Sequence, residues 1–361
     1  MNGNKYCIIM AGGIGSRFWP MSRQSLPKQF IDILGTGKSF IRHTYERFAK
    51  IIPTENFLVV TNVKYKDLVL EHLPELSEAQ VLTEPVGRST APCIAYAAWK
   101  IKDVDPDALM VVTPADHFIL DEEEFRGVIN ECLEFAGKEP VLMTIGIKPN
   151  RPDTGYGYIQ IDRKVKLAES DIRKVKTFTE KPGLEMARVF LESGEFYWNS
   201  GIFVWKVSTI MEVMDKHLPE LQDQFRSVAP YYNTPGEHSH IEAIYPQCRN
   251  ISIDIGIMEK AKNVYVRCSD FGWSDIGTWG SLYQNSQKDS HGNVVSKNCI
   301  TYDTEGCIIK TDDDVLTVIE GLKNYIVVNS GGVLMICPCE NEQDIKKFID
   351  DVRFKTGDKF I

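Results

Sequence analysis

Short apolar runs alternate with amphipathic segments over about the first 285 residues. The runs have the length of single strands and are apolar on both faces, as buried parallel strands are: 6–10, 57–60, 109–112 and 141–145. Between the last two runs, residues 121–136 place apolar side chains at helical spacing, and residues 90–102 open with Ala91-Pro92, which is typical of a first helical turn. The pattern predicts an α/β fold with a mostly parallel sheet and helices on both faces.

The pattern changes after "KDSHGNVV" at 288–295. The apolar runs become shorter and are separated by turn sequences such as "TDDD" and "NSGG": 307–309, 316–319 and 325–328. A last helix is indicated by the spacing of Ile345, Phe348, Ile349 and Val352. We therefore predict a large domain over 1–285 and a small β-rich C-terminal domain over 286–361 that ends in a helix.

Composition and charge exclude several classes of protein. Of the 361 residues, 43% are hydrophobic and 25% charged, as in ordinary globular proteins, and the net charge of −9 disfavours a nucleic-acid partner. The nine cysteines form no CxxC pair, and no secretory segment precedes the first run, which predicts reduced thiols and a cytoplasmic protein. No apolar run approaches the roughly 20 residues that cross a bilayer, so no membrane association is expected.

The first predicted strand runs into "AGGIGSRFWPMSRQSLPKQF" at 11–30, which is rich in glycine and then basic. The stretch lacks the Gly-Lys-Ser/Thr of a P-loop, and Phe18 stands where a dinucleotide fingerprint needs its third glycine. Glycines allow backbone N–H groups to approach a phosphate, Arg17 can grip its oxygens in a fork, and Lys28 can act as a point charge. A strand–helix turn followed by a solvated basic loop is the alternative.

This stretch resembles the signature of the sugar-nucleotide pyrophosphorylases, G-G-x-G-[ST]-R-[LF]-x-P…P-K, and its Trp19-Pro20 and Pro27 to Phe30 variants resemble the mannose-1-phosphate guanylyltransferase branch. The resemblance implies a Rossmann-like fold of the nucleotide-diphospho-sugar transferase type with a β-helix-like C-terminal domain, in a short form without an isomerase domain. It also implies that Arg17 holds the departing pyrophosphate and that Lys28 neutralises charge near the α-phosphate, as the catalytic pair. The residues expected to wrap the nucleotide are Ala11, Gly12, Gly13, Gly15 and Ser16.

A second segment, "EPVGRSTAPCIA", resembles the family's E-P-x-G-R-N-T-A-P sequence along the base and ribose. The resemblance makes Glu84, Gly87, Arg88 and Thr90 nucleotide-binding residues. Ser89 replaces the more usual asparagine, so no base contact is assigned to it, and Thr90 is expected to cap the following helix. Read alone, the segment is a turn with an N-cap.

Two carboxylates are expected to hold Mg²⁺. Asp116 stands at the carboxyl end of a buried strand in "TPADHFI", where a hard cation can share protein and phosphate oxygens, and His117 is interpreted as a structural histidine. By resemblance, Pro114 and Ala115 contact the nucleotide, and Asp275 in "FGWSDIGTW" is the second magnesium carboxylate. Without the family, Asp275 would be a turn residue.

Three segments resemble the sugar side of the family's site. In "DTGYGYI", Gly157 lets the backbone approach a hydroxyl; in "FTEKP", Glu180 accepts from sugar hydroxyls and Lys181 contacts the sugar phosphate; in "WNSGIFVW", Asn199 offers a donor and an acceptor. Each motif alone is common by chance, but the family segments follow one another in the family's order.

The resemblance implies attack of a sugar-1-phosphate oxygen on the α-phosphorus of a nucleoside triphosphate, which needs no general base because the nucleophile is already an anion. The expected substrates are GTP and mannose 1-phosphate, with GDP-mannose and pyrophosphate as products. Fucose, heptose or glucose 1-phosphate as the sugar, or a non-catalytic sugar-nucleotide sensor, are the alternatives. A homodimer is expected because the exposed strands of the C-terminal region need covering.

Overall fold

The computed structural model describes residues 4–166 and 170–361, which form two compact units. The first unit contains residues 1–12, 44–115 and 119–273 of the chain, and the second contains 13–43, 116–118 and 274–361. Each unit is therefore assembled from segments that are distant in sequence. The predicted sequence boundary after residue 285 stays a prediction.

The first unit is built on a nine-stranded mixed sheet with the strand order β3-β2-β1-β4-β9-β6-β10-β8-β7. Strands β3, β2, β1 and β4 are parallel to one another, whereas β9 pairs antiparallel with both β4 and β6. The predicted α/β class is confirmed, although the sheet is mixed rather than mostly parallel, and the four predicted apolar runs are β1, β2, β4 and β6. The strands are β1 (Lys5–Ala11), β2 (Phe57–Asn62), β3 (Val81–Glu84), β4 (Leu109–Pro114), β6 (Leu142–Ile147), β7 (Tyr158–Lys166), β8 (Ile172–Thr179), β9 (Phe196–Lys206) and β10 (Val264–Ser269).

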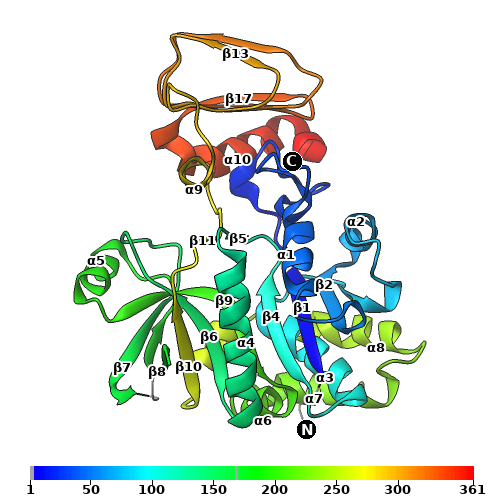
Figure 1. Cartoon of the computed structure of the whole chain (residues 1–361). Helices are drawn as coiled ribbons and strands as arrows, with labels where there is room; N and C mark the ends of the chain where they lie inside the picture. Colours follow the sequence, from blue (N-terminus) through cyan, green and yellow to red (C-terminus); the bar gives the residue numbers. More distant parts are fainter. Residues whose placement is uncertain (1–3, 167–169) are drawn as a thin grey trace. The chain divides into compact units, whose positions relative to one another are not determined.

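Helices cover both faces of this sheet because its central strands are buried on both sides. Met110 and Val112 of β4 share a core with α3 (Thr90–Val104), whereas the intervening Val111 is equally buried and points the other way. Helix α4 (Glu122–Lys138) packs on β4, β6, β9 and β10 and lies in front of the sheet in Figure 1. Its first turn is capped by Asp121, whose carboxylate accepts from the backbone N–H groups of Glu123 and Glu124.

The second unit consists of two small sheets, a C-terminal helix and the 13–43 segment. Strands β12 (Val294–Val295), β14 (Ile308–Thr311) and β16 (Tyr325–Ser330) are parallel, β17 (Val333–Pro338) closes that sheet antiparallel, and β13 (Cys299–Tyr302) pairs with β15 (Thr317–Glu320). The predicted last helix is α10 (Ile345–Thr356). Such short parallel strands, repeated along the chain, match the predicted β-rich character.

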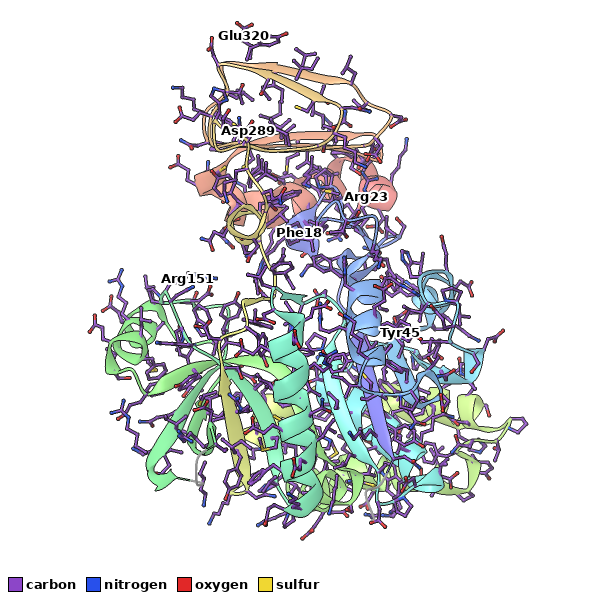
Figure 2. The ribbon with its side chains drawn as sticks, viewed as in Figure 1. Phe18, Arg23, Tyr45, Arg151, Asp289 and Glu320 are labelled. Atoms are coloured by element: carbon purple, nitrogen blue, oxygen red, sulfur yellow. The ribbon has the colours of Figure 1, made fainter. Side chains whose placement is uncertain are left out.

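The core of the second unit joins its early and late segments. Phe18 of the short helix η1 (Ser16–Phe18) packs on Trp279 of α9 (Trp279–Asn285), with ring centroids 5.0 Å apart. Phe18 and Arg23, labelled in Figure 2, belong to the same unit, and the Arg23 guanidinium donates to the Gly331 carbonyl oxygen at 2.9 Å. The buried members of this core include Trp19, Phe40, Ile308, Ile326, Ile345 and Ile349.

The remaining helices and short strands connect these parts. They are α1 (Phe40–Ala49), α2 (Lys66–His72), α5 (Leu184–Ser193), α6 (Val207–His217), α7 (Pro219–Arg226), α8 (Glu237–Ile244), β5 (Phe118–Ile119), β11 (Trp273–Ser274) and a π-helical turn, η8 (Asp254–Met258). In the described ranges, none of the helices has the length and apolar character needed to cross a membrane.

Candidate active site

The signature loop follows β1 and is packed around one glycine. Gly15 has φ +71°, and a Cβ at this position would lie only 2.4 Å from the Cβ of Lys28. The Lys28 backbone N–H donates to the Ile14 carbonyl oxygen at 3.0 Å, and the Ser22 hydroxyl donates to that of Gly15 at 2.6 Å. The loop thus lies directly against the turn η2 (Lys28–Phe30).

We expect Gly15→Ala to lower stability and to displace Lys28. Alanine is strained at a positive φ, and its methyl group would clash with the lysine side chain. Gly37→Ala is the matched control, since Gly37 has φ +83° but no atom within 4 Å of the built Cβ. The free energy of unfolding should fall by about 1–3 kcal/mol more in the first variant than in the second. Denaturant unfolding measures both, and equal losses would contradict the close packing.

Lys28 is almost fully buried, and three oxygens fix its ammonium. Its Nζ donates to Asp116 Oδ2 at 2.9 Å, to the Asp116 carbonyl oxygen at 3.3 Å and to the Asp275 carbonyl oxygen at 2.6 Å. It also lies over the ring of Phe40, 5.0 Å from the centroid. Although burial favours the neutral acid, the Lys28 ammonium, together with His117, holds the pKa of Asp116 below its usual range.

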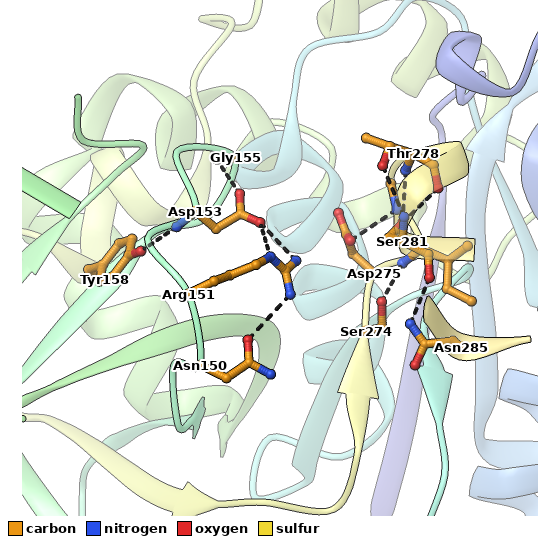
Figure 3. A network of polar contacts seen from close by, with 12 residues as sticks. Asn150, Arg151, Asp153, Gly155, Tyr158, Ser274, Asp275, Thr278, Ser281 and Asn285 are labelled. Carbon is orange, nitrogen blue, oxygen red and sulfur yellow. Dashed lines mark hydrogen bonds and ion pairs between the residues drawn. The ribbon is translucent and has the colours of Figure 1, made fainter. Parts of the chain in front are cut away.

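Asp275 occupies a tight loop between β11 and α9, shown at the right of Figure 3. Its Oδ1 accepts from the Gly277 backbone N–H at 3.0 Å, and the intervening Ile276 is buried with φ +39°, a region that a β-branched residue rarely adopts. Thr278 caps α9 by accepting from the Ser281 N–H at 3.2 Å. The strained residue and the helix cap together fix the direction of the Asp275 side chain.

One cavity of the second unit, of about 330 Å³, collects the predicted catalytic and metal residues. Arg17, Lys28, Asp116 and Asp275 all line it, and so do Gly15, Ser16, Phe18, His117, Gly277 and Lys346. Within residues 4–166 and 170–361, Arg17 has no hydrogen bond or ion pair, so its guanidinium is available to a ligand. His117 is buried and lines the same cavity. Among the described residues, no group of three or more His, Cys, Asp or Glu side chains is placed to hold a metal ion.

In the first unit, Glu84 ends β3 as a buried carboxyl group. The Tyr245 hydroxyl donates to its Oε1, and a Cβ on Gly12 would lie 3.6 Å from its Oε2. Burial raises the pKa of Glu84 to about 7, against the opposing effect of the Tyr245 hydrogen bond. Tyr245 is fully buried, and this partner of Glu84 was not predicted from the sequence, since nothing local in "EAIYPQC" marks it.

The raised pKa of Glu84 predicts a pH-dependent stability. Because the folded state binds this proton more tightly than the unfolded chain, stability is highest below pH 4.5 and falls as the pH rises towards 7. Glu84→Gln removes the titrating group, so up to about 3 kcal/mol of the pH-dependent fall in the free energy of unfolding should disappear. The stability of the variant relative to the wild type should therefore rise between pH 5 and 8. Unfolding curves across this range, with the exposed Glu55→Gln as control, test this; parallel curves for Glu84→Gln and wild type would refute it.

The prediction that Thr90 caps α3 is wrong. Ser89 occupies the N-cap position with φ 64° and ψ −169°, a conformation typical of glycine, and no side chain caps the helix. The Thr90 hydroxyl instead accepts from the Ile253 backbone N–H at 2.8 Å. Arg88 is likewise committed to the protein, because its guanidinium donates to the Pro246 carbonyl oxygen.

The other predicted nucleotide residues lie at strand ends and in loops. Ala11 ends β1, and its carbonyl oxygen accepts from the Thr61 hydroxyl at 2.8 Å. Pro114 ends β4, and the Ala115 carbonyl oxygen accepts from the Thr44 hydroxyl at 3.0 Å. Two glycines are exposed and have no atom within 4 Å of a built Cβ, which leaves their backbone open to a ligand: Gly13 and Gly87.

The predicted sugar residues lie together in the first unit. A Cβ on Gly157 would meet Glu180 Oε2 at 2.6 Å, and the Gly157 carbonyl oxygen accepts from the Asn199 N–H at 2.8 Å. Lys181, with φ 45°, forms an ion pair with Glu180 at 2.8 Å. Any side chain at position 157 would therefore displace the carboxylate from its present place.

Asp254 is the main residue of this cluster that the sequence reading missed. Its Oδ1 accepts from Asn199 Nδ2 at 2.9 Å, while Asn199 Oδ1 accepts from the Thr144 hydroxyl at 2.9 Å, so the amide is held in one orientation. Burial, with the nearby Glu180, raises the pKa of Asp254 to about 6. Its only signal in the sequence is a single acid in the apolar run "ISIDIGIM".

The loop that leads to Gly157 is held by its own polar contacts, at the left of Figure 3. Arg151 Nη2 donates to Asp153 Oδ2 at 2.8 Å, and the Asp153 Oδ1 accepts from the Gly155 N–H at 2.8 Å. The Asp153 N–H in turn donates to the Tyr158 hydroxyl at 3.0 Å. These contacts fix the backbone conformation of a loop whose glycines would otherwise allow several conformations.

Comparisons with known proteins match the chain to two family models, one after the other along the sequence. Residues 6–292 match the nucleotidyl transferase family model, and residues 297–352 match the MannoseP isomerase/GMP-like beta-helix domain. The chain is 36% identical to a mannose-1-phosphate guanylyltransferase of Escherichia coli, over 95% of this chain and 73% of that protein. It is 35% identical to an alginate biosynthesis protein of Pseudomonas syringae, over 95% and 70% of the two chains. The crystal structure of a mannose-1-phosphate geranyltransferase from Thermus thermophilus superposes with a TM-score of 0.85 at 29% identity, covering 98% of this chain and 100% of that one.

Proposed function

Since the chain belongs to the nucleotidyl transferase family, among relatives named mannose-1-phosphate guanylyltransferase, we propose that it transfers the guanylyl group of GTP to α-D-mannose 1-phosphate. The products are GDP-mannose and pyrophosphate. The observation that carries the proposal is the single cavity lined by Arg17, Lys28, Asp116 and Asp275, because these groups suit phosphate chemistry.

The reaction is an in-line displacement at the α-phosphorus. An oxygen of the sugar phosphate forms the new bond to phosphorus, and the bond to the bridging oxygen breaks, so that its electron pair leaves with pyrophosphate. The nucleophile is an anion at neutral pH, which agrees with a cavity whose lining contains cations and carboxylates but no cysteine. Catalysis then depends on alignment and on charge stabilisation.

The cations have separate tasks in this scheme. The Lys28 ammonium, fixed by oxygens of Asp116 and Asp275, presents a desolvated charge near the α-phosphate. Arg17, which is uncommitted in the described part of the chain, binds oxygens of the departing pyrophosphate in its planar fork. In the first unit, Glu84, Gly87, Arg88 and Thr90 are proposed for the base and ribose, and Gly157, Glu180, Lys181 and Asn199 for the sugar phosphate.

The two carboxylates of the cavity fit a hard divalent cation. Asp116 and Asp275 supply few protein oxygens, which is the donor set that Mg²⁺ prefers when substrate phosphates complete its coordination. When bound, the ion neutralises phosphate charge and orients the triphosphate. The protein holds the two carboxyl groups in place for the ion: the Gly277 N–H binds Asp275, and the Lys28 ammonium binds Asp116.

Pyrophosphate release should be measured over a grid of GTP, ATP, UTP and dTTP against mannose, glucose, fucose and heptose 1-phosphates, with and without Mg²⁺. We expect the highest kcat/KM for GTP with mannose 1-phosphate and no release without a divalent cation. A higher kcat/KM for another pair would contradict the proposed substrates and assign that pair to the enzyme instead. No release from any pair, heptose 1-phosphate included, would leave a sugar-nucleotide sensor in place of the enzyme.

A further inference from the structure

The C-terminal helix contributes one side chain to the cavity of Arg17 and Lys28. Lys346, the second residue of α10, lines this cavity, which is formed within the second unit. Resting on the proposed function, we propose that Lys346 is a phosphate-binding residue of the transfer site and that its ammonium contacts the β- and γ-phosphates that leave as pyrophosphate.

Lys346 is uncommitted to other residues of the protein. It is exposed and has no hydrogen bond or ion pair to any residue in 4–166 or 170–361. Lys28, in contrast, is buried and bound to oxygens of Asp116 and Asp275. Lys347, the next residue of the same helix, is exposed as well but does not line the cavity. The two neighbouring lysines therefore differ in position rather than in chemistry.

The charge of the cavity depends on Lys346. Among the lining side chains, the cations Arg17 and Lys28 are balanced by the two carboxylates Asp116 and Asp275, so these four groups sum to zero. Apart from the titratable His117, Lys346 is the remaining charged group of the lining, and it makes the sum positive. A triphosphate bears several negative charges, and a pocket of net positive charge attracts it and lowers the cost of its desolvation.

The helix that carries Lys346 is firmly attached to the signature loop. Ile345, directly before it, is fully buried in the core that contains Phe18. Trp19 Nε1 donates to the Phe360 carbonyl oxygen at 2.8 Å, and the Gly280 N–H donates to Glu342 Oε2 at 2.7 Å just before the helix. The Lys346 backbone is thus fixed while its long side chain stays free to follow a phosphate, as a lysine point charge does.

The test measures the binding of inorganic pyrophosphate to the full-length chain by titration calorimetry, in the presence of Mg²⁺. The variants are Lys346→Ala, Lys346→Arg and, as the matched control, Lys347→Ala. Loss of one charged hydrogen bond should weaken the Kd of Lys346→Ala by about tenfold or more, and the arginine variant should recover most of it. Lys347→Ala should bind as the wild type does, and all three should unfold at the wild-type temperature.

Pyrophosphate is used because it separates this inference from the proposed substrates. If no nucleotide and sugar pair is turned over, the proposed function fails, yet a selective loss of pyrophosphate binding in Lys346→Ala still supports the residue's role. Equal Kd values for Lys346→Ala, Lys347→Ala and wild type overturn the proposal. Absence of pyrophosphate binding to the wild type overturns it too. Should Lys346→Ala unfold early, Lys346→Gln, which keeps most of the side chain, is compared with Lys347→Gln in the same way.

Discussion

Lys28→Met should lower kcat for pyrophosphate release by about 10³-fold, or about 4 kcal/mol of transition-state stabilisation. The lysine charge is buried and fixed by Asp116 and by the Asp275 carbonyl oxygen, so its loss leaves the Asp116 carboxylate beside an anionic substrate without its ion-pair partner. Methionine keeps the apolar stem between Phe18 and Phe40, and the fold should survive.

Steady-state kinetics with GTP and mannose 1-phosphate measure this effect, and Lys28→Ala gives a second, more disruptive variant. Lys64→Met, at an exposed position of the first unit, is the control for loss of one positive charge. Turnover near the wild-type value in a folded Lys28→Met enzyme would remove the ammonium from the mechanism.

Asp275→Asn should lower kcat/KM by at least about 100-fold and raise the Mg²⁺ concentration needed for half-maximal rate. Asparagine keeps an oxygen that accepts the Gly277 N–H, so the loop between β11 and α9 should hold its shape while the charge is lost. The cation would then be held by Asp116 alone among the carboxylates of the cavity lining.

Mg²⁺ titrations at fixed substrate concentrations separate a loss of metal affinity from a loss of rate. Asp270→Asn, at an exposed position, is the matched control. Removal of the cation with a chelator should abolish the wild-type rate, and added Mg²⁺ should restore it. An unchanged Mg²⁺ dependence in Asp275→Asn would show that this carboxylate does not hold the ion.

The half of the large sheet that was predicted correctly is the half whose strands are buried on both faces. Runs such as 57–60 are continuous and apolar because helices cover both sides of β2 and β4. Strand β8 reads "IRKVKTFT", with charged residues at half-buried and exposed positions, and its antiparallel pairing with β10 and β7 has no comparable signal. The strands that could be predicted are therefore those whose side chains are buried on both faces of the sheet.

The candidate site also contains residues that a local sequence pattern marks and residues that none marks. That Arg17 and Lys28 line one cavity could be expected, because glycines and basic residues at fixed spacing lie within one short loop. Tyr245 and Asp254 are bound to Glu84 and Asn199, which lie far away in the chain, and no local pattern marks them. Lys346 likewise lines a cavity with residues distant in sequence, and its own segment gives no signal of this. The helix cap was wrongly assigned to Thr90 because Ser89, the residue before it, occupies the N-cap position in a conformation that serine rarely adopts. The expected homodimer stays a prediction.

The core shared by Phe18, Trp279 and Ile345 limits how this chain can be cut and spliced. A fragment ending at residue 285 would strip Phe18, Trp19 and Trp279 of buried partners, and exposed aromatic surface of this kind favours aggregation. Exchange of the C-terminal segment between relatives should succeed only when residues 13–43 travel with it. For any such exchange, the signature loop and the C-terminal helix thus count as one module, although they stand near opposite ends of the chain.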